Sequence, residues 1–214
     1  MSTDTQTLDE AAVCHWLEAN LPGFAGPLEV TKFQAGQSNP TFLLSTPAHD
    51  YVLRRKPPGT LLKSAHAVDR EYRITMALHE AGLPVAEPLL LCEDEDVIGS
   101  IFYVMRYVPG RSFWDPRMPG LDRAERAAIY DSANETLARL HLVDFASLGL
   151  GDYGKPGNYF ARQISRWSRQ YDASRTRNIP EMDRLIDWLP SAIPVTEERT
   201  TIIHGDYSFH NLLV

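Results

Sequence analysis

The chain has 214 residues, of which 43% are hydrophobic and 23% are charged, which is typical of a folded globular protein with one large domain or two small ones. A formal net charge of −7 argues against a general nucleic-acid-binding protein, which would carry a basic surface. The two cysteines have no paired spacing, the N-terminus lacks a secretory pattern, and no apolar run is long enough to span a membrane. We therefore expect a cytoplasmic protein without a nucleic-acid or membrane partner.

The first part of the chain predicts a sheet with two helices. Apolar residues at helical spacing predict a helix over residues 8–21, ended by Pro22 and Gly23. Short runs rich in Val, Phe, Leu and Tyr over residues 28–55, separated by turn residues, predict three antiparallel strands. Residues 64–84 predict a long helix, and residues 101–108 predict a further strand.

After Pro119 the pattern becomes helical. Three amphipathic segments, residues 121–144, 157–174 and 179–190, predict helices, and strand character returns at residues 200–206. The change from strand patterns to helical patterns near residues 108–111 predicts an α+β protein of two lobes, residues 1–108 and residues 109–214.

The closing stretch "TTIIHGDYSFHNLLV" carries the densest set of reactive side chains. Asp206 and Asn211 have the spacing of the Asp and Asn in the kinase catalytic-loop signature, H-R-D-x-x-x-x-N. One such loop supplies a carboxylate for the attacking hydroxyl and an oxygen ligand for Mg²⁺. Its apolar flanks, residues 200–203 and 212–214, are expected to be short strands. Two alternatives remain open, a metal clasp of His204, Asp206 and His210, and an ordinary turn.

Several motifs, taken in order along the chain, resemble those of the aminoglycoside phosphotransferase and choline kinase-like family. They are "FQAGQSN", "YVLRRK", "DREYR", "YVMRYVPG" and "HGDYSFHN". The stretches "YVLRRKPPG", "AHAVDREYR" and "NYFARQISRWSRQY" further resemble the kinase-like region of acyl-CoA dehydrogenase fusion proteins and their stand-alone bacterial relatives.

This resemblance implies a protein kinase-like two-lobed fold, with a nucleotide-binding lobe over residues 1–108 and a helical lobe that is incomplete at Val214. It also implies Mg-ATP as cofactor and transfer of the γ-phosphoryl group to a hydroxyl of a small molecule, such as a hydroxyacyl-CoA or an aminoglycoside-like compound. A second metal-binding Asp is expected beyond Val214, so that the chain alone should not turn over ATP productively. A catalytically inactive pseudokinase or binding module is the alternative.

The resemblance assigns a role to individual residues. Asp206 is the expected base and Asn211 the expected Mg²⁺ ligand. Arg54 stands where the family pattern has Lys, so it is the expected phosphate clamp, with Lys56 as the alternative, and Glu71 is its expected ion-pair partner.

The remaining expected contacts line the nucleotide and the acceptor. The residues expected beside the phosphates and the adenine are Gly36, Ser38, Asn39, Val52, Tyr107 and Val108. Tyr159 and Trp167 are weaker candidates for the acceptor site. A hairpin turn at residues 36–39, a surface ion pair for Glu71 and core packing of the aromatic residues are the competing interpretations.

Overall fold

The computed structural model describes residues 8–33, 39–57, 67–155, 157–195 and 200–214. The chain forms two compact units, residues 1–143 together with 203–214, and residues 144–202. The two units are defined by which segments of the chain pack against one another. The lobe boundary expected between residues 108 and 109 stays a prediction.

The first unit is built on an antiparallel sheet of five strands in the order β1-β2-β3-β5-β4. The strands are β1 (Glu29–Lys32), β2 (Thr41–Ser45), β3 (Asp50–Arg55), β4 (Pro88–Cys92) and β5 (Phe102–Arg106). The three antiparallel strands predicted for residues 28–55 and the strand predicted for residues 101–108 are confirmed. β4 was not predicted, although its apolar run "PLLLC" is typical of a buried strand.

One face of the sheet carries the hydrophobic core. The helix α1 (Glu10–Asn20), predicted from its spacing, buries Val13 and Leu17 against Phe42, Leu53 and other apolar side chains of the strands. Its N-terminus is capped by Asp9, whose carboxylate accepts a hydrogen bond from the backbone N–H of Ala12 at 3.0 Å.

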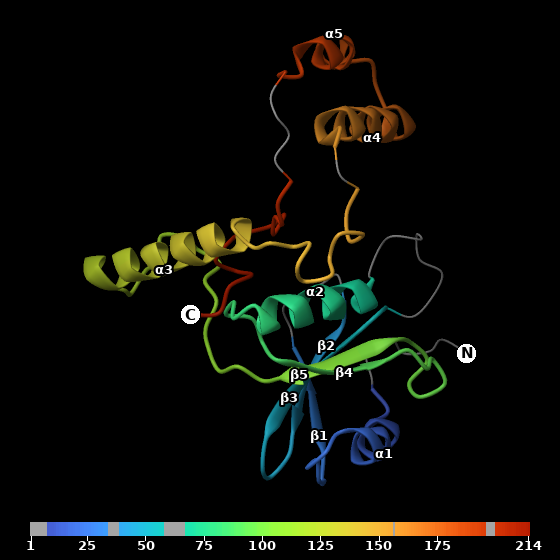
Figure 1. The fold of residues 1–214 in the computed structure, drawn as a ribbon, viewed down its shortest axis with the longest axis vertical. Helices are drawn as coiled ribbons and strands as arrows, with labels where there is room; N and C mark the ends of the chain where they lie inside the picture. The colour runs from blue at the N-terminus through green and yellow to red at the C-terminus, as the bar shows by residue number, and fades with distance from the viewer. Residues whose placement is uncertain (1–7, 34–38, 58–66, 156, 196–199) are drawn as a thin grey trace. The chain divides into compact units, whose positions relative to one another are not determined.

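The opposite face of the sheet is covered by α2 (Val68–Glu80), so the two helices lie on opposite sides of it (Figure 1). Alternate residues of a strand point to opposite faces. Leu53 and Arg55 therefore lie on the α1 side, and Val52 and Arg54 lie on the α2 side. Tyr103 of β5, which is paired with Arg54 in the register, packs against α2 by its contact with the ring of Tyr72, at 6.0 Å between ring centres.

The helix α3 (Arg123–His141) begins with a capping box. The carboxylate of Asp122 accepts from the backbone N–H of Glu125, and the Glu125 carboxylate accepts from that of Asp122, both at 2.8 Å. Near its other end, Arg139 donates to the carbonyl of Gly82 at 2.6 Å, which ties α3 to the turn after α2. The predicted helix over residues 121–144 is confirmed.

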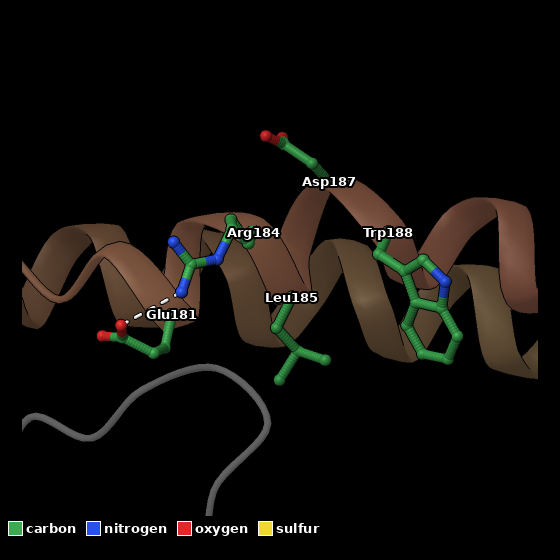
Figure 2. Close-up of a pocket in the computed structure, with 5 residues that line it drawn as sticks. All are labelled: Glu181, Arg184, Leu185, Asp187 and Trp188. Atoms are coloured by element: carbon green, nitrogen blue, oxygen red, sulfur yellow. Dashed lines mark hydrogen bonds and ion pairs between the residues drawn. The ribbon is translucent and has the colours of Figure 1, made fainter.

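The second unit contains α4 (Tyr159–Ser174), α5 (Pro180–Trp188) and the short 3₁₀ helix η1 (Leu189–Ala192), in agreement with the two helices predicted there. A shallow pocket runs along α5 and is lined by Glu181, Arg184, Leu185, Asp187 and Trp188 (Figure 2). An ion pair of 3.0 Å joins Glu181 to Arg184 at its edge. No helix in the described part of the chain has the length and apolar composition of a membrane span.

The strands expected at residues 200–203 and 212–214 are not formed, and this prediction was wrong. Residues 212–214 do pair with the chain after β5, through two hydrogen bonds between the backbones of Arg111 and Val214, at 3.0 and 3.1 Å. Such a short pairing cannot sustain a ladder, because a regular strand needs several successive partners.

Candidate active site

Asp206 and Asn211 are joined directly within the closing loop. The side-chain amide of Asn211 donates to the carboxylate Oδ2 of Asp206 at 2.8 Å and to the backbone carbonyl of Asp206 at 3.0 Å. Gly205, which precedes Asp206, has a φ of 84°, in the left-handed region that glycine adopts without strain. Both polar side chains are exposed, so a reactant could reach them.

Aromatic side chains hold this loop against α3. The hydroxyl of Tyr207 donates to the carbonyl of Ala133 at 2.7 Å, and the ring of Phe209 packs edge-on against Tyr130, at 4.6 Å between ring centres. Burial raises the pKa of the Tyr207 hydroxyl, so it remains a donor. The helix therefore provides a fixed support for Asp206 and Asn211.

The chain after β5 lies along the same loop. The backbone N–H of Phe113 donates to the carbonyl of Phe209 at 3.0 Å. The indole of Trp114 stacks on the imidazole of His210, with ring centres 5.0 Å apart and planes within 8°. Sequence reasoning missed Trp114, because an exposed aromatic residue in a Pro- and Gly-rich segment carries no periodic signal.

Arg54 and Glu71 form the ion pair that the sequence predicted. Nε of Arg54 lies 2.7 Å from Oε2 of Glu71, and each side chain is about one-third exposed. Glu71 lies in the first turn of α2, where the helix dipole favours a carboxylate. Its other oxygen, Oε1, accepts a hydrogen bond from the side-chain amide of Asn39 at 2.7 Å.

The residues around this pair are buried on the α2 side of the sheet. Val52 lies opposite Met105, and Arg54 lies opposite Tyr103. Burial raises the pKa of the Tyr103 hydroxyl, and the negative charge of the nearby Glu71 raises it further. Tyr103 was missed by sequence reasoning, which considered its strand only as a connection between lobes.

The neighbouring cations have other environments. Arg55 is only 5% exposed and lies on the opposite face of β3, with its guanidinium 5.8 Å from the centre of the Phe42 ring. Burial lowers the pKa of this guanidinium. Lys56 follows β3, and its backbone N–H donates to the carbonyl of Ile101 at 3.0 Å. Of the three successive cations, Arg54 is the one that faces Glu71.

The segment expected beside adenine follows β5. The backbone N–H of Tyr107 donates to the carbonyl of Asp50 at 3.2 Å, and Val108 is 40% exposed. Further along, a Cβ on Gly110 would lie 3.2 Å from Cβ of Leu213, which is tighter than an ordinary van der Waals contact, so glycine favours the close approach of the two segments.

The other expected site residues lie outside the described residues or in the second unit. Gly36 and Ser38 lie outside the described residues. Tyr159 and Trp167 belong to the second unit, where both are about half exposed. Their expected roles stay predictions.

The two histidines of the loop make local contacts. Nδ1 of His204 accepts from the backbone N–H of Asp206 at 3.3 Å, and the imidazole of His210 is hydrogen-bonded to the Ser208 hydroxyl at 2.9 Å. Among the described residues, no group of three or more His, Cys, Asp or Glu side chains could hold a metal ion. The alternative of a metal clasp made by His204, Asp206 and His210 is therefore contradicted.

Comparison with known proteins identifies the class to which this fold and loop belong. The sequence profile described as "Phosphotransferase enzyme family" matches residues 29–214, and the chain belongs to that family. The fold is that of the protein kinase-like phosphotransferases, as predicted from the motifs.

Individual relatives are consistent with this assignment. The chain is 48% identical to acyl-CoA dehydrogenase family member 11 of Mus musculus over 92% of its own length and 26% of that protein. It resembles a crystal structure of a proposed aminoglycoside phosphotransferase from Ralstonia eutropha, with 51% identity, a TM-score of 0.86, and coverage of 97% of this chain and 61% of that one. A GDP complex of aminoglycoside 2'-phosphotransferase-IIIa shares the fold at 17% identity, with a TM-score of 0.65 over 96% of this chain and 67% of that one.

The chain thus spans about a quarter of the length of its relative from Mus musculus. The resemblance to the kinase-like region of acyl-CoA dehydrogenase fusion proteins, inferred from "YVLRRKPPG" and "AHAVDREYR", is confirmed.

Proposed function

We propose that this chain is the kinase module of a small-molecule phosphotransferase, which transfers the γ-phosphoryl group of ATP to a hydroxyl group of its acceptor. The observation that carries the proposal is the hydrogen bond of 2.8 Å between Asn211 and Asp206. It places a carboxylate and an amide in one supported loop, in the spacing that phosphoryl transfer uses. The Arg54–Glu71 ion pair supports the same reading, because it fixes a cation suited to phosphate.

In the proposed reaction, the acceptor oxygen forms a bond to the γ-phosphorus while the bond between that phosphorus and the β–γ bridging oxygen breaks. The acceptor proton passes to the carboxylate of Asp206, and ADP leaves with the bridging oxygen. Asn211 orients the carboxylate by its hydrogen bond to Oδ2, which leaves Oδ1 for the acceptor hydroxyl. Arg54 holds the phosphates in place.

The donor set of the loop fits a divalent cation of the Mg²⁺ type. Such ions prefer oxygen ligands, and the loop offers the amide oxygen of Asn211. The amide nitrogen of Asn211 faces Asp206, so its oxygen remains for a cation. A bound Mg²⁺ would neutralise charge on the phosphates.

The identity of the relatives favours one class of acceptor. Several are named acyl-CoA dehydrogenase family members, and we propose a hydroxyacyl-CoA as the acceptor for this chain. An aminoglycoside-like compound is the second candidate, since the similar structure from Ralstonia eutropha carries that description.

The experiment is a transfer assay with the protein as it is expressed from its gene. Mg-ATP is supplied with a panel of hydroxyacyl-CoA thioesters and aminoglycosides, and mass spectrometry detects a phosphorylated acceptor. Phosphorylation that requires Asp206, tested with Asp206→Asn, is the expected result. Nucleotide binding without transfer to any acceptor would favour the alternative, a binding module without turnover.

A further inference from the structure

Asn39 is a buried polar residue that the proposed reaction does not use directly. The residue is 2% exposed, and Pro40 separates it from the first residue of β2. Its amide donates to Oε1 of Glu71, 32 residues further along the chain, at 2.7 Å. A hydrogen bond to a carboxylate is among the stronger polar contacts in a protein.

The Glu71 carboxylate is thereby held at both oxygens. Oε1 accepts from Asn39 and Oε2 accepts from Nε of Arg54, each at 2.7 Å. The backbone of Glu71 is also fixed, since its N–H donates to the carbonyl of Ala67 and its carbonyl accepts from the Thr75 hydroxyl at 2.8 Å. A carboxylate held by two donors on opposite oxygens loses the freedom to rotate about its terminal bond.

The nitrogen through which Arg54 binds Glu71 affects how the guanidinium can contact a phosphate. Glu71 is bound through Nε, the inner nitrogen of the guanidinium. The two terminal amino groups of the same planar group carry further donors, in a fork that matches phosphate oxygens. An arginine held by Nε can therefore pair with a carboxylate and a phosphate together, in a direction set by the carboxylate. A lysine has one nitrogen for both tasks.

We propose that Asn39 is a positioning residue for nucleotide binding: it fixes the carboxylate of Glu71, which fixes the direction in which Arg54 presents its terminal amino groups. The inference rests on the proposed function, in which Arg54 contacts the phosphates. It differs from the expectation that Asn39 itself touches the phosphates, because here Asn39 acts through Glu71.

An exchange of donor and acceptor tests this chain of contacts. Asn39→Ala removes the donor, and Asn39→Asp replaces it with a carboxylate that repels Glu71. The double variant Asn39→Asp with Glu71→Gln restores a hydrogen bond of opposite direction at unchanged net charge. The amide nitrogen of residue 71 then donates to residue 39, and its amide oxygen can still accept from Arg54.

The measurement is the Kd of Mg-ATP, obtained by isothermal titration calorimetry on this chain. We expect Asn39→Ala to weaken binding about tenfold, as the loss of one hydrogen bond to a charged group would. Asn39→Asp should weaken it further, and the double variant should recover most of the affinity that Asn39→Asp loses. Asn20→Asp, the same chemical change at the end of α1, is the matched control and should leave the Kd unchanged.

Two results would overturn the inference. One is a double variant that binds no better than Asn39→Asp, which would indicate a direct contact of Asn39 with the nucleotide. The other is an Asn39→Ala variant with the Kd of the unmodified chain.

A nucleotide-free measurement separates this inference from the proposed function. Asn39→Ala and Glu71→Ala should each lower the Tm. A variant that carries both alanine substitutions should lower it by less than the sum of the two single shifts, because either change alone removes the same contact. Additive shifts would overturn the positioning role. If the unmodified chain binds no Mg-ATP while the shifts are non-additive, the proposed function fails and the Asn39–Glu71 coupling stands. The link from that coupling to nucleotide binding would then be overturned.

Discussion

The side-chain amide of Asn211 makes two hydrogen bonds to Asp206, one to its carboxylate at 2.8 Å and one to its backbone carbonyl at 3.0 Å. The five-residue spacing between them therefore closes a small loop in which the amide orients the carboxylate.

Asp206→Asn should lower turnover of the full-length protein by orders of magnitude while the Kd of Mg-ATP changes little. The new amide keeps an acceptor for Asn211 but cannot take a proton from the acceptor hydroxyl. Single-turnover kinetics and calorimetry give the two quantities. Asp187→Asn, at an exposed position of α5, is a control for the same chemical change. Equal losses of turnover and of affinity for Mg-ATP would contradict the placement of Asp206 beside the acceptor.

Arg54→Ala and Glu71→Ala should each weaken nucleotide binding, and the double variant should lose less than the sum of the two single losses. The reason is that their 2.7 Å ion pair is removed by either change alone. We expect a coupling free energy of about 1 kcal/mol in the Kd of Mg-ATP, within the usual range for residues in contact. Simple additivity would mean that the two side chains act independently on the nucleotide.

Tyr207→Phe should lower the free energy of unfolding by about 1 kcal/mol, the usual net value of one hydrogen bond, because the carbonyl of Ala133 loses its donor. Urea denaturation measures this. Tyr171→Phe is a matched control: its hydroxyl is buried without a hydrogen-bond partner in the described part of the chain, so its removal should be neutral or stabilising. A Tyr207→Phe variant as stable as this control would mean that the bond to α3 does not hold the loop.

Glu87→Gln should make stability less dependent on pH in the acid range. The hydrogen bond from Arg106 at 2.7 Å, together with the charges of Arg106 and His79, holds the pKa of Glu87 below its ordinary value of 4.5. A carboxyl with a lowered folded-state pKa contributes stability that is present above its unfolded-state pKa and is lost as pH falls through the folded-state value.

The native chain should therefore exceed Glu87→Gln in stability near neutral pH and lose this advantage below about pH 4. Because both side chains of the pair are more than 40% exposed, the difference at neutral pH should stay below about 1 kcal/mol. Urea denaturation at pH 7 and pH 3.5 provides the comparison. If the two proteins differ in free energy of unfolding by the same amount at both pH values, ionisation of Glu87 is excluded as the source of the difference.

The sequence predicted the helices well because each carries its own periodic signal or cap. α3, for example, begins at a capping box that can be read directly from Asp122 and Glu125. The strands of residues 28–55 were predicted equally well, because turn residues separate them. β4 was missed because a short apolar run without alternation could equally belong to a buried loop or helix.

The candidate site was predictable where spacing within one segment decides it, as for Asp206 and Asn211. The Arg54–Glu71 pair was predictable only through the order of motifs. Contacts that depend on tertiary packing were not predictable. The bond from Asn39 to Glu71 joins residues 32 positions apart. The stacking of Trp114 on His210 joins two segments whose local sequences give no sign that they lie together.

The stacking of Trp114 on His210 has an experimental use. Trp114 is 72% exposed, and its partner is the residue immediately before Asn211. Any displacement of the loop that carries Asp206 must separate the two rings, and the indole then exchanges an imidazole neighbour for water. The emission of Trp114, isolated by replacing the other three tryptophans with phenylalanine, would therefore report the position of the loop that carries Asp206 without an added label.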